Sequence, residues 1–136
     1  MTRIRAVVAL VPWLIIGVGC DDSRRSAVAD DLRQLAEVRD ALESARARNG
    51  DYPSTLDELV RMGLLSEEKL LNKTIARNAK PLRLSYRRPS PESKSDLIIV
   101  WMPTGDRKST EPVGVLRLNG SVQSMPAEDA VKELQQ

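Results

Sequence analysis

The sequence predicts an α+β fold in which a long N-terminal helix packs on a three- to four-stranded antiparallel sheet and a short helix ends the chain. Two observations support this prediction. Apolar residues recur with helical spacing in the first half of residues 26–136, and strand-like runs separated by turn signals follow in the second half. Helices first and strands last are typical of α+β proteins. We expect this domain to span residues 26–136.

An apolar run precedes the domain. Fourteen residues, 6–19, lie between a pair of nearby arginines and Cys20, and charged residues follow the cysteine at once. A membrane-spanning helix needs about 20 apolar residues, whereas shorter runs after basic residues are typical of secretory signal peptides. The sequence therefore predicts an export signal over residues 1–19 and a short tether over residues 20–25.

The end of this run is Gly17-Val18-Gly19-Cys20. It resembles a bacterial lipoprotein signal, in which an aliphatic residue and two small ones precede the lipidated cysteine, although Gly17 stands where leucine is usual. The resemblance implies cleavage before Cys20, a thioether-linked lipid on Cys20 and fatty acylation, such as palmitate, of the new amino terminus. Two or more acyl chains hold a protein stably on a membrane.

The resemblance places the domain on the extracytoplasmic side of a bacterial membrane and leaves the choice of inner or outer membrane open. An ordinary secretory signal cut nearby, or an uncleaved short anchor, are the alternatives for the same segment. In both of them Cys20 is incidental.

Composition narrows the function classes. The chain has 21 basic and 19 acidic residues, and the two-unit excess lies in the signal segment, so the mature chain is balanced. A nucleic-acid-binding protein needs a basic face, and we expect no such partner. The single cysteine rules out an intramolecular disulfide. With no phenylalanine, the core must consist mainly of Leu, Val, Ile and Ala.

The long helix is predicted over residues 26–48. Its apolar stripe has spacings of three and four, and Asn49-Gly50 is a stop signal. Side-chain pairs four residues apart are expected on its exposed face. The stripe consists of Val28, Leu32, Leu35, Val38, Leu42 and Ala45, and the expected pairs are Arg33 with Glu37 and Arg39 with Glu43.

A second, short helix is predicted over residues 55–62. Ser54 with Asp57, or Thr55 with Glu58, has the spacing of a capping box, and Gly63 can end the helix. A further turn is expected over residues 66–71.

The second half has strand periodicity. Alternation over residues 82–87, the run in 96–102, and the segments 113–118 and 121–125 predict four strands, with Asn119-Gly120 as a type I′ hairpin turn. A terminal helix is expected after Pro126, with Val131 and Leu134 on one face.

This order of elements resembles type IV pilin-like proteins, especially the pseudopilins of type II secretion. The segment Asn49-Gly50-Asp51-Tyr52-Pro53 is similar to the family's junction between long helix and globular head, and residues 115–122 are similar to its closing hairpin. True pilins carry their apolar stalk after the cleavage point, whereas here the apolar run precedes it. The chain is thus similar to a pilin-type head on a lipid anchor and is not expected to enter a filament by the pilin route.

Three residues besides Cys20 are candidates for partner binding or for a structural role: Tyr52, Pro53 and Trp101. We favour the structural role for Tyr52 and Pro53, at the corner after the long helix. Pseudopilin heads sometimes hold calcium near the sheet, and Asp106 and Glu111 are the residues here that resemble such a loop. Calcium needs six to eight oxygen ligands, so we expect solvated loop charges and no metal.

The sequence favours a protein-interaction module over an enzyme. It contains no histidine, and lipidation uses the only cysteine, so no cofactor other than the covalent lipid is expected. The expected partners are the membrane and envelope or secretion proteins, with the oligomeric state open. A glycan- or peptidoglycan-binding lipoprotein is the first alternative and needs exposed aromatic residues such as Trp101. A hydrolase is the second and needs serine, lysine and carboxylates in one pocket.

Overall fold

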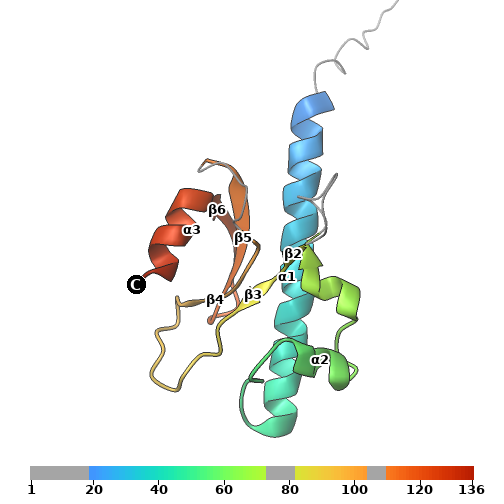
Figure 1. Ribbon diagram of the computed structural model, residues 1–136, viewed down its shortest axis with the longest axis vertical. Helices are drawn as coiled ribbons and strands as arrows, with labels where there is room; N and C mark the ends of the chain where they lie inside the picture. Colours follow the sequence, from blue (N-terminus) through green and yellow to red (C-terminus); the bar gives the residue numbers. More distant parts are fainter. Residues whose placement is uncertain (1–18, 73–81, 104–109) are drawn as a thin grey trace, which may run out of the picture.

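The computed structural model describes residues 19–72, 82–103 and 110–136, with side chains described from residue 27 onward (Figure 1). The chain is α+β, as predicted, with a long helix, a four-stranded antiparallel sheet, a two-stranded ribbon and a short C-terminal helix. The helices are α1 (Gly19–Asn49), α2 (Asp57–Arg61) and α3 (Ala127–Leu134), with a 3₁₀ turn, η2 (Glu67–Leu70). The strands are β1 (Leu71–Asn72), β2 (Leu82–Arg83), β3 (Ser85–Tyr86), β4 (Ile98–Trp101), β5 (Pro112–Arg117) and β6 (Val122–Pro126).

Helix α1 is the longest element, with 31 residues and a length of about 46 Å. The predicted apolar stripe is buried from Leu35 to Ala45, while Val28 and Leu32 are half-buried. The helix stops where predicted, because Gly50 has a φ of +79° and its N–H donates to the Arg46 carbonyl. Its start differs, since α1 begins at Gly19 and not near residue 26, so residues 21–25 are helical.

The four-stranded sheet has the order β3-β4-β5-β6, and every neighbouring pair is antiparallel. The predicted meander of consecutive strands is therefore confirmed. Helix α1 packs on one face, mainly on β5 and β6, and α3 packs on the other face of the same two strands (Figure 1). Covering on both faces explains why β5 is buried over four consecutive residues, Val113 to Leu116.

Helix α1 approaches the sheet most closely at Gly114. A Cβ atom at this position would lie 2.9 Å from Leu35 Cδ1 and 3.4 Å from Met102 Cγ. Leu35 and Met102 are fully buried, so neither side chain has free space to move into. The missing side chain of Gly114 thus sets the distance between the helix and the central strand.

Helix α3 is held to the opposite face by Arg117. This guanidinium donates to Glu133 Oε2 at 2.8 Å and Oε1 at 3.1 Å, to the Asp96 carbonyl at 2.7 Å and to Gln123 Oε1 at 2.9 Å. Bidentate pairing with Arg117 lowers the pKa of Glu133. The arginine therefore ties β5, β6, α3 and the segment just before β4 together.

The predicted terminal helix is present as α3, and its buried residues are two alanines. Ala127 and Ala130 are buried, Leu134 is half-buried and Val131 is 38% exposed. Small residues face the sheet because α3 follows β6 without a loop and lies close to it.

Two predictions about the middle of the chain are wrong. The capping box is absent, because Leu56 is the N-cap of α2 and no side chain caps this helix. The strand expected over residues 82–87 is divided, since β2 pairs with β1 and β3 pairs with β4. Leu84 lies between the two pieces, where its N–H donates to the Leu70 carbonyl and its side chain is buried. Strand β1 was not predicted.

The β5–β6 turn also differs from the type I′ prediction. Arg117 N–H donates to the Ser121 carbonyl, and Gly120 N–H donates to the Arg117 carbonyl, so the loop has three residues, 118–120. Gly120 has a φ of +92°, which is typical of the last position of a three-residue hairpin loop. The loop lies against α1, where Arg39 Nη1 donates to the Gly120 carbonyl at 3.3 Å.

No helix within the described ranges is long and apolar enough to cross a membrane.

We predict that Gly114→Ala lowers the free energy of unfolding by about 1–3 kcal/mol, because the added methyl group overpacks a closed contact with Leu35. Chemical denaturation measures the change. Ser124→Ala is the control, since Ser124 is the exposed cross-strand neighbour of Gly114, and we expect it to change stability by less than about 0.5 kcal/mol. Equal stability of the Gly114→Ala variant and the wild type would contradict the close contact.

We predict that Arg117→Gln destabilises the domain by roughly 2 kcal/mol at pH 7, because it removes charge-assisted hydrogen bonds from a largely buried side chain. A lowered Glu133 pKa stabilises the fold above the ordinary value of 4.5, and this stabilisation is lost as the pH falls through the lowered value. The difference between wild type and variant should therefore shrink in acid. Denaturation curves from pH 7 to pH 3 test this, with exposed Arg61→Gln as a control that should show no such pH dependence.

Candidate functional site

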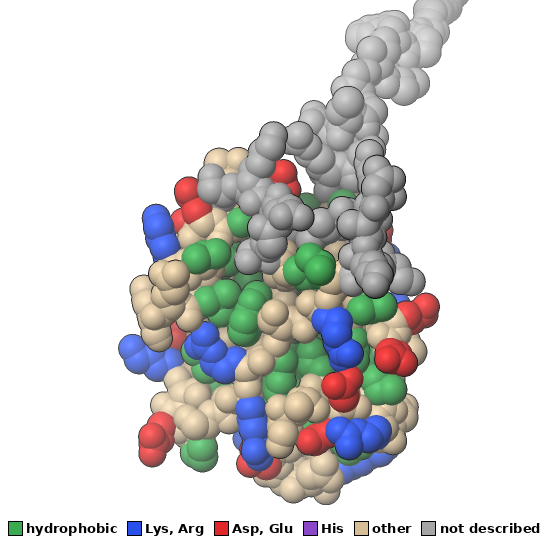
Figure 2. All heavy atoms as spheres, in the orientation of Figure 1, with side chains coloured by type: hydrophobic (Ala, Val, Ile, Leu, Met, Phe, Trp, Pro, Cys, Tyr) green, Lys and Arg blue, Asp and Glu red, His purple; other side chains and the backbone are tan. Residues whose placement is uncertain are grey.

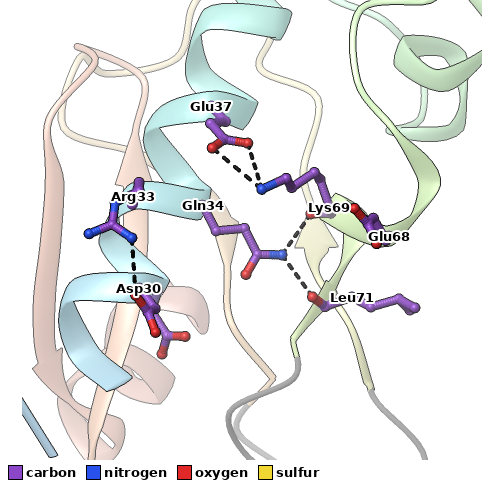
Figure 3. A pocket seen from close by; sticks show the side chains of 8 residues that line it. Asp30, Arg33, Gln34, Glu37, Glu68, Lys69 and Leu71 are labelled. Carbon is purple, nitrogen blue, oxygen red and sulfur yellow. Dashed lines mark hydrogen bonds and ion pairs between the residues drawn. The ribbon is translucent and has the colours of Figure 1, made fainter. Parts of the chain in front are cut away.

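A groove runs between α1 and the segment formed by residues 64–71 (Figure 3). It contains two hollows, of about 250 Å³ and about 350 Å³, that share Glu37 and Lys69. On α1 the lining residues recur with helical spacing, on a different side of the helix from most of the core stripe. The first hollow is lined by Asp30, Asp31, Arg33, Gln34, Glu37, Glu68, Lys69 and Leu71, and the second by Glu37, Asp40, Ala41, Ser44, Leu64, Leu65, Ser66 and Lys69.

Gln34 holds the two walls of the first hollow together. Its Nε2 donates to the Lys69 carbonyl at 2.7 Å and to the Leu71 carbonyl at 2.8 Å. Both amide hydrogens are thereby used, which fixes the orientation of the amide. Figure 3 shows its oxygen turned away from these two carbonyls, and this Oε1 accepts no hydrogen bond from the described part of the chain.

The charged side chains of α1 do not pair as the sequence predicted. Glu37 accepts an ion pair from Lys69 at 3.1 Å and not from Arg33, which pairs with Asp30 at 3.1 Å. Arg39 reaches Asp40 at 3.2 Å and not Glu43. The Lys69–Glu37 pair crosses the groove between its two hollows, so a tertiary contact replaces the expected contact within the helix.

The second hollow brings serine, lysine and carboxylates together, as the hydrolase alternative requires. Within the described residues, however, no hydrogen bond joins Lys69 Nζ to Ser44 or Ser66, and this ammonium pairs with Glu37. A serine–lysine mechanism needs a neutral amine within hydrogen-bond reach of the hydroxyl. Among the described residues, neither serine makes such a contact with Lys69.

Tyr52 and Pro53 lie outside the groove, at the corner after α1. The Arg46 guanidinium lies 5.0 Å from the centre of the Tyr52 ring and donates to its hydroxyl at 3.3 Å. Pro53 is buried, and its carbonyl accepts a 2.8 Å hydrogen bond from Tyr86, whose pKa is raised by burial. These contacts attach the corner to α1 and to β3.

Trp101 is half-buried on β4 and packs against the core. Its ring lies 5.8 Å from the Arg87 guanidinium, and Arg87 also donates to the Leu134 carbonyl at 3.0 Å. A sugar-binding platform needs an open ring face, and this ring is packed and in contact with a cation. The glycan alternative therefore gains no support at Trp101.

The remaining candidates are placed only in part. Cys20 lies in the first turn of α1, and its side chain is not among those described. Asp106 falls outside the described residues, whereas Glu111 is exposed and its carbonyl accepts from Ala127 N–H. Within the ranges described, no three acidic or cysteine side chains converge in a way that would hold a metal ion.

Sequence reasoning missed the groove and two buried polar residues beside it. Asp31 and Asn72 are 5% and 0% exposed. Asn72 Nδ2 contacts Met102 Sδ, and Asp31 Cβ lies 3.6 Å from the position of a Gly114 Cβ atom. The position of Asp31 at the edge of an apolar stripe is only a weak sign of burial. Nothing in the local sequence indicates that Asn72, after η2, is buried.

Comparison with known proteins found no matching family model, no matching curated protein and no matching solved structure.

We predict that Gln34→Glu destabilises the domain by about 2 kcal/mol at pH 7, because a carboxylate would face two carbonyl acceptors that have lost their donor. Protonation restores one donor, so the folded state raises the pKa of the new carboxyl and the loss relative to wild type should shrink as the pH falls. Thermal unfolding at pH 7 and pH 4.5 measures both effects. Gln135→Glu, at the exposed end of the chain, is the control and should match wild type at both pH values.

Proposed function

We propose that the chain is a lipid-anchored lipoprotein on the extracytoplasmic side of the bacterial cell envelope, with a pilin-like domain that binds other envelope or secretion proteins. The observation that carries the interaction role is the groove along α1, because its walls are fixed to one another by Gln34 and by the Lys69–Glu37 pair. A preformed groove binds with little ordering cost. A binding role fits this geometry better than catalysis does.

The signal-like residues 1–19 and the position of Cys20 support the anchor. Helix α1 also supports the anchor, because it runs without a break from Gly19 into the core and would connect Cys20 rigidly to the domain. With a rise of about 1.5 Å per residue, Asp30 lies about 15 Å along the helix from Cys20. An anchor at Cys20 would thus present the groove close to the membrane surface on a stiff stem.

The order of elements supports the pilin-like part of the proposal. A long N-terminal helix lies on an antiparallel meander, and the helix ends in Asn49-Gly50 before a corner that contains Tyr52-Pro53. In this proposal the head is an accessory or structural component that works from a lipid anchor and not from a filament.

The proposal predicts both a modified amino terminus and a partner at the groove. Protein isolated from bacterial membranes should begin at Cys20 and carry a thioether-linked lipid and an amide-linked acyl group by mass spectrometry, whereas Cys20→Ser should lack the lipid. A photo-activated cross-linker at Ser44, in the groove, should capture a specific protein in intact envelopes.

The control position is Glu92, an exposed residue of the loop between β3 and β4, where the same cross-linker should capture little. An intact Met1 or an unmodified Cys20 would overturn the anchor. Equal capture at both positions, or no capture from Ser44, would overturn the interaction role of the groove.

A further inference from the structure

We infer that the outer edge of β6 binds an extended, uncharged segment of an envelope protein as an added antiparallel strand. This inference goes beyond the groove and concerns another surface of the domain. Its choice of occupant rests on the proposed anchor, because the anchor decides between a partner protein and a second copy of this chain.

The register of the β5–β6 ladder shows which backbone groups of β6 bond to β5. Next to the hairpin loop, Arg117 N–H donates to the Ser121 carbonyl, and the register beyond this pair is regular. Hydrogen-bonded and non-hydrogen-bonded pairs alternate along an antiparallel ladder. The groups that face β5 therefore belong to Gln123 and Met125.

The backbone groups of Val122 and Ser124 point the other way, toward the outer edge of the sheet. Within the described ranges, neither their N–H groups nor their carbonyls have a hydrogen-bond partner on that side. Pro126 has no N–H, so an added ladder would end there. The edge thus offers two donors and two acceptors at the spacing that an added strand needs.

The two edges of the sheet differ in how they are protected. Strand β3 has only two residues, with Arg83 shortly before it and Arg87 and Arg88 directly after it. Short strands and charged side chains are the usual protection of an edge against pairing. Residues 121–126 carry no charge, although basic and acidic side chains are spread over the face shown in Figure 2. The β6 edge is therefore the one open to pairing.

A second copy of this chain does not suit the edge when both copies are anchored. Antiparallel pairing of β6 with β6 of another copy places a two-fold axis perpendicular to the sheet. Helix α1 lies along one face of the sheet, so this axis reverses its direction in the other copy (Figure 1). The two Cys20 residues would lie toward opposite ends of the pair, and one membrane surface could not hold both lipids.

The size of the edge also favours a peptide segment. Strand β6 has five residues and a length of about 17 Å. A stable interface between two folded proteins buries about 1,200–2,000 Å², which is more than one added strand of this length provides. Strand addition of a peptide needs less, because main-chain hydrogen bonds supply the affinity.

The side chains of β6 indicate the chemistry of the segment. Ser124 lies opposite Gly114 on the face toward α1, so Val122 shares that face and Met125 lies on the face toward α3. Val122 and Met125 are half-buried and pack against the core. Partner residues opposite these two gain most from being apolar. In an antiparallel strand they are three positions apart, with two uncharged residues between them.

The test measures amide hydrogen exchange by NMR on the full lipid-anchored chain in detergent micelles. The probe is a ten-residue serine–glycine peptide with two valines three positions apart. Without it, the Val122 and Ser124 amides should exchange at least tenfold faster than those of Gln123 and Met125. Saturating probe should slow the faster pair at least tenfold. A comparison peptide with N-methyl groups on the second valine and on the residue after the first valine should change nothing.

Ser124→Pro is the edge variant, because it removes an outward N–H and places a ring where the added strand would lie. Proline is tolerated on an edge strand when the missing N–H faces solvent. We expect at least tenfold weaker binding of fluorescent probe. Ser124→Thr keeps the N–H and is the matched control, which should bind within twofold of wild type. Circular dichroism and melting curves verify that both variants fold.

Equal binding of the probe and the N-methylated peptide, or amide exchange that the probe does not slow, would overturn the inference. Slow exchange at Val122 and Ser124 without probe, together with a dimeric mass by ultracentrifugation, would assign the edge to a second copy and also overturn it. Cross-linking from Ser44 reports on the groove, and the mass of the amino terminus reports on the anchor. Failure of the proposed function is therefore distinguishable from failure at β6.

Discussion

The fold depends on the contact between Leu35 and Gly114. Helix α1 lies close to the central strand because Gly114 has no side chain, and Leu35 fills the space that a Cβ atom would take. A helix set farther out would leave voids around Val38 and Leu42 and would lose the dispersion contacts of a close-packed core. The position of α1 in turn limits where the sheet, the hairpin loop and the segment before β1 can pack, since all three touch it.

Because of this contact, α1 packs against other elements on two of its sides. One side is occupied by β5 and β6, so the segment formed by residues 64–71 packs against another side of the helix and is fastened there by Gln34. The groove follows from this arrangement: its two walls are joined by one amide and one ion pair, and charged side chains lie between them. A helix that packs fully around its circumference would leave no such surface.

Periodicity predicted the elements well, and local turn rules predicted their ends less well. The stripe on α1 and the strand order followed from residue spacing, and the stop followed from Asn49-Gly50. The positive φ of Gly50 confirms this stop. The expected capping box failed because Leu56 is buried and occupies the N-cap position. The hairpin turn failed because Arg117 pairs with Ser121, which leaves three residues in the loop. At the start of α2 the burial of Leu56 outweighed a local preference, and at the hairpin the pairing register did.

The groove could not be predicted, because the property that defines it is a long-range pairing. From sequence, Glu37 had a partner four residues away in Arg33, and such a pair predicts an ordinary solvated helix face. In the structure Glu37 pairs with Lys69, 32 residues later, and the charged side chains of this part of α1 line one wall of a groove. Each pair alone is weak, so the loss of the local one costs little. The gain is a groove whose two walls are fixed to each other by Gln34 and by the Lys69–Glu37 pair.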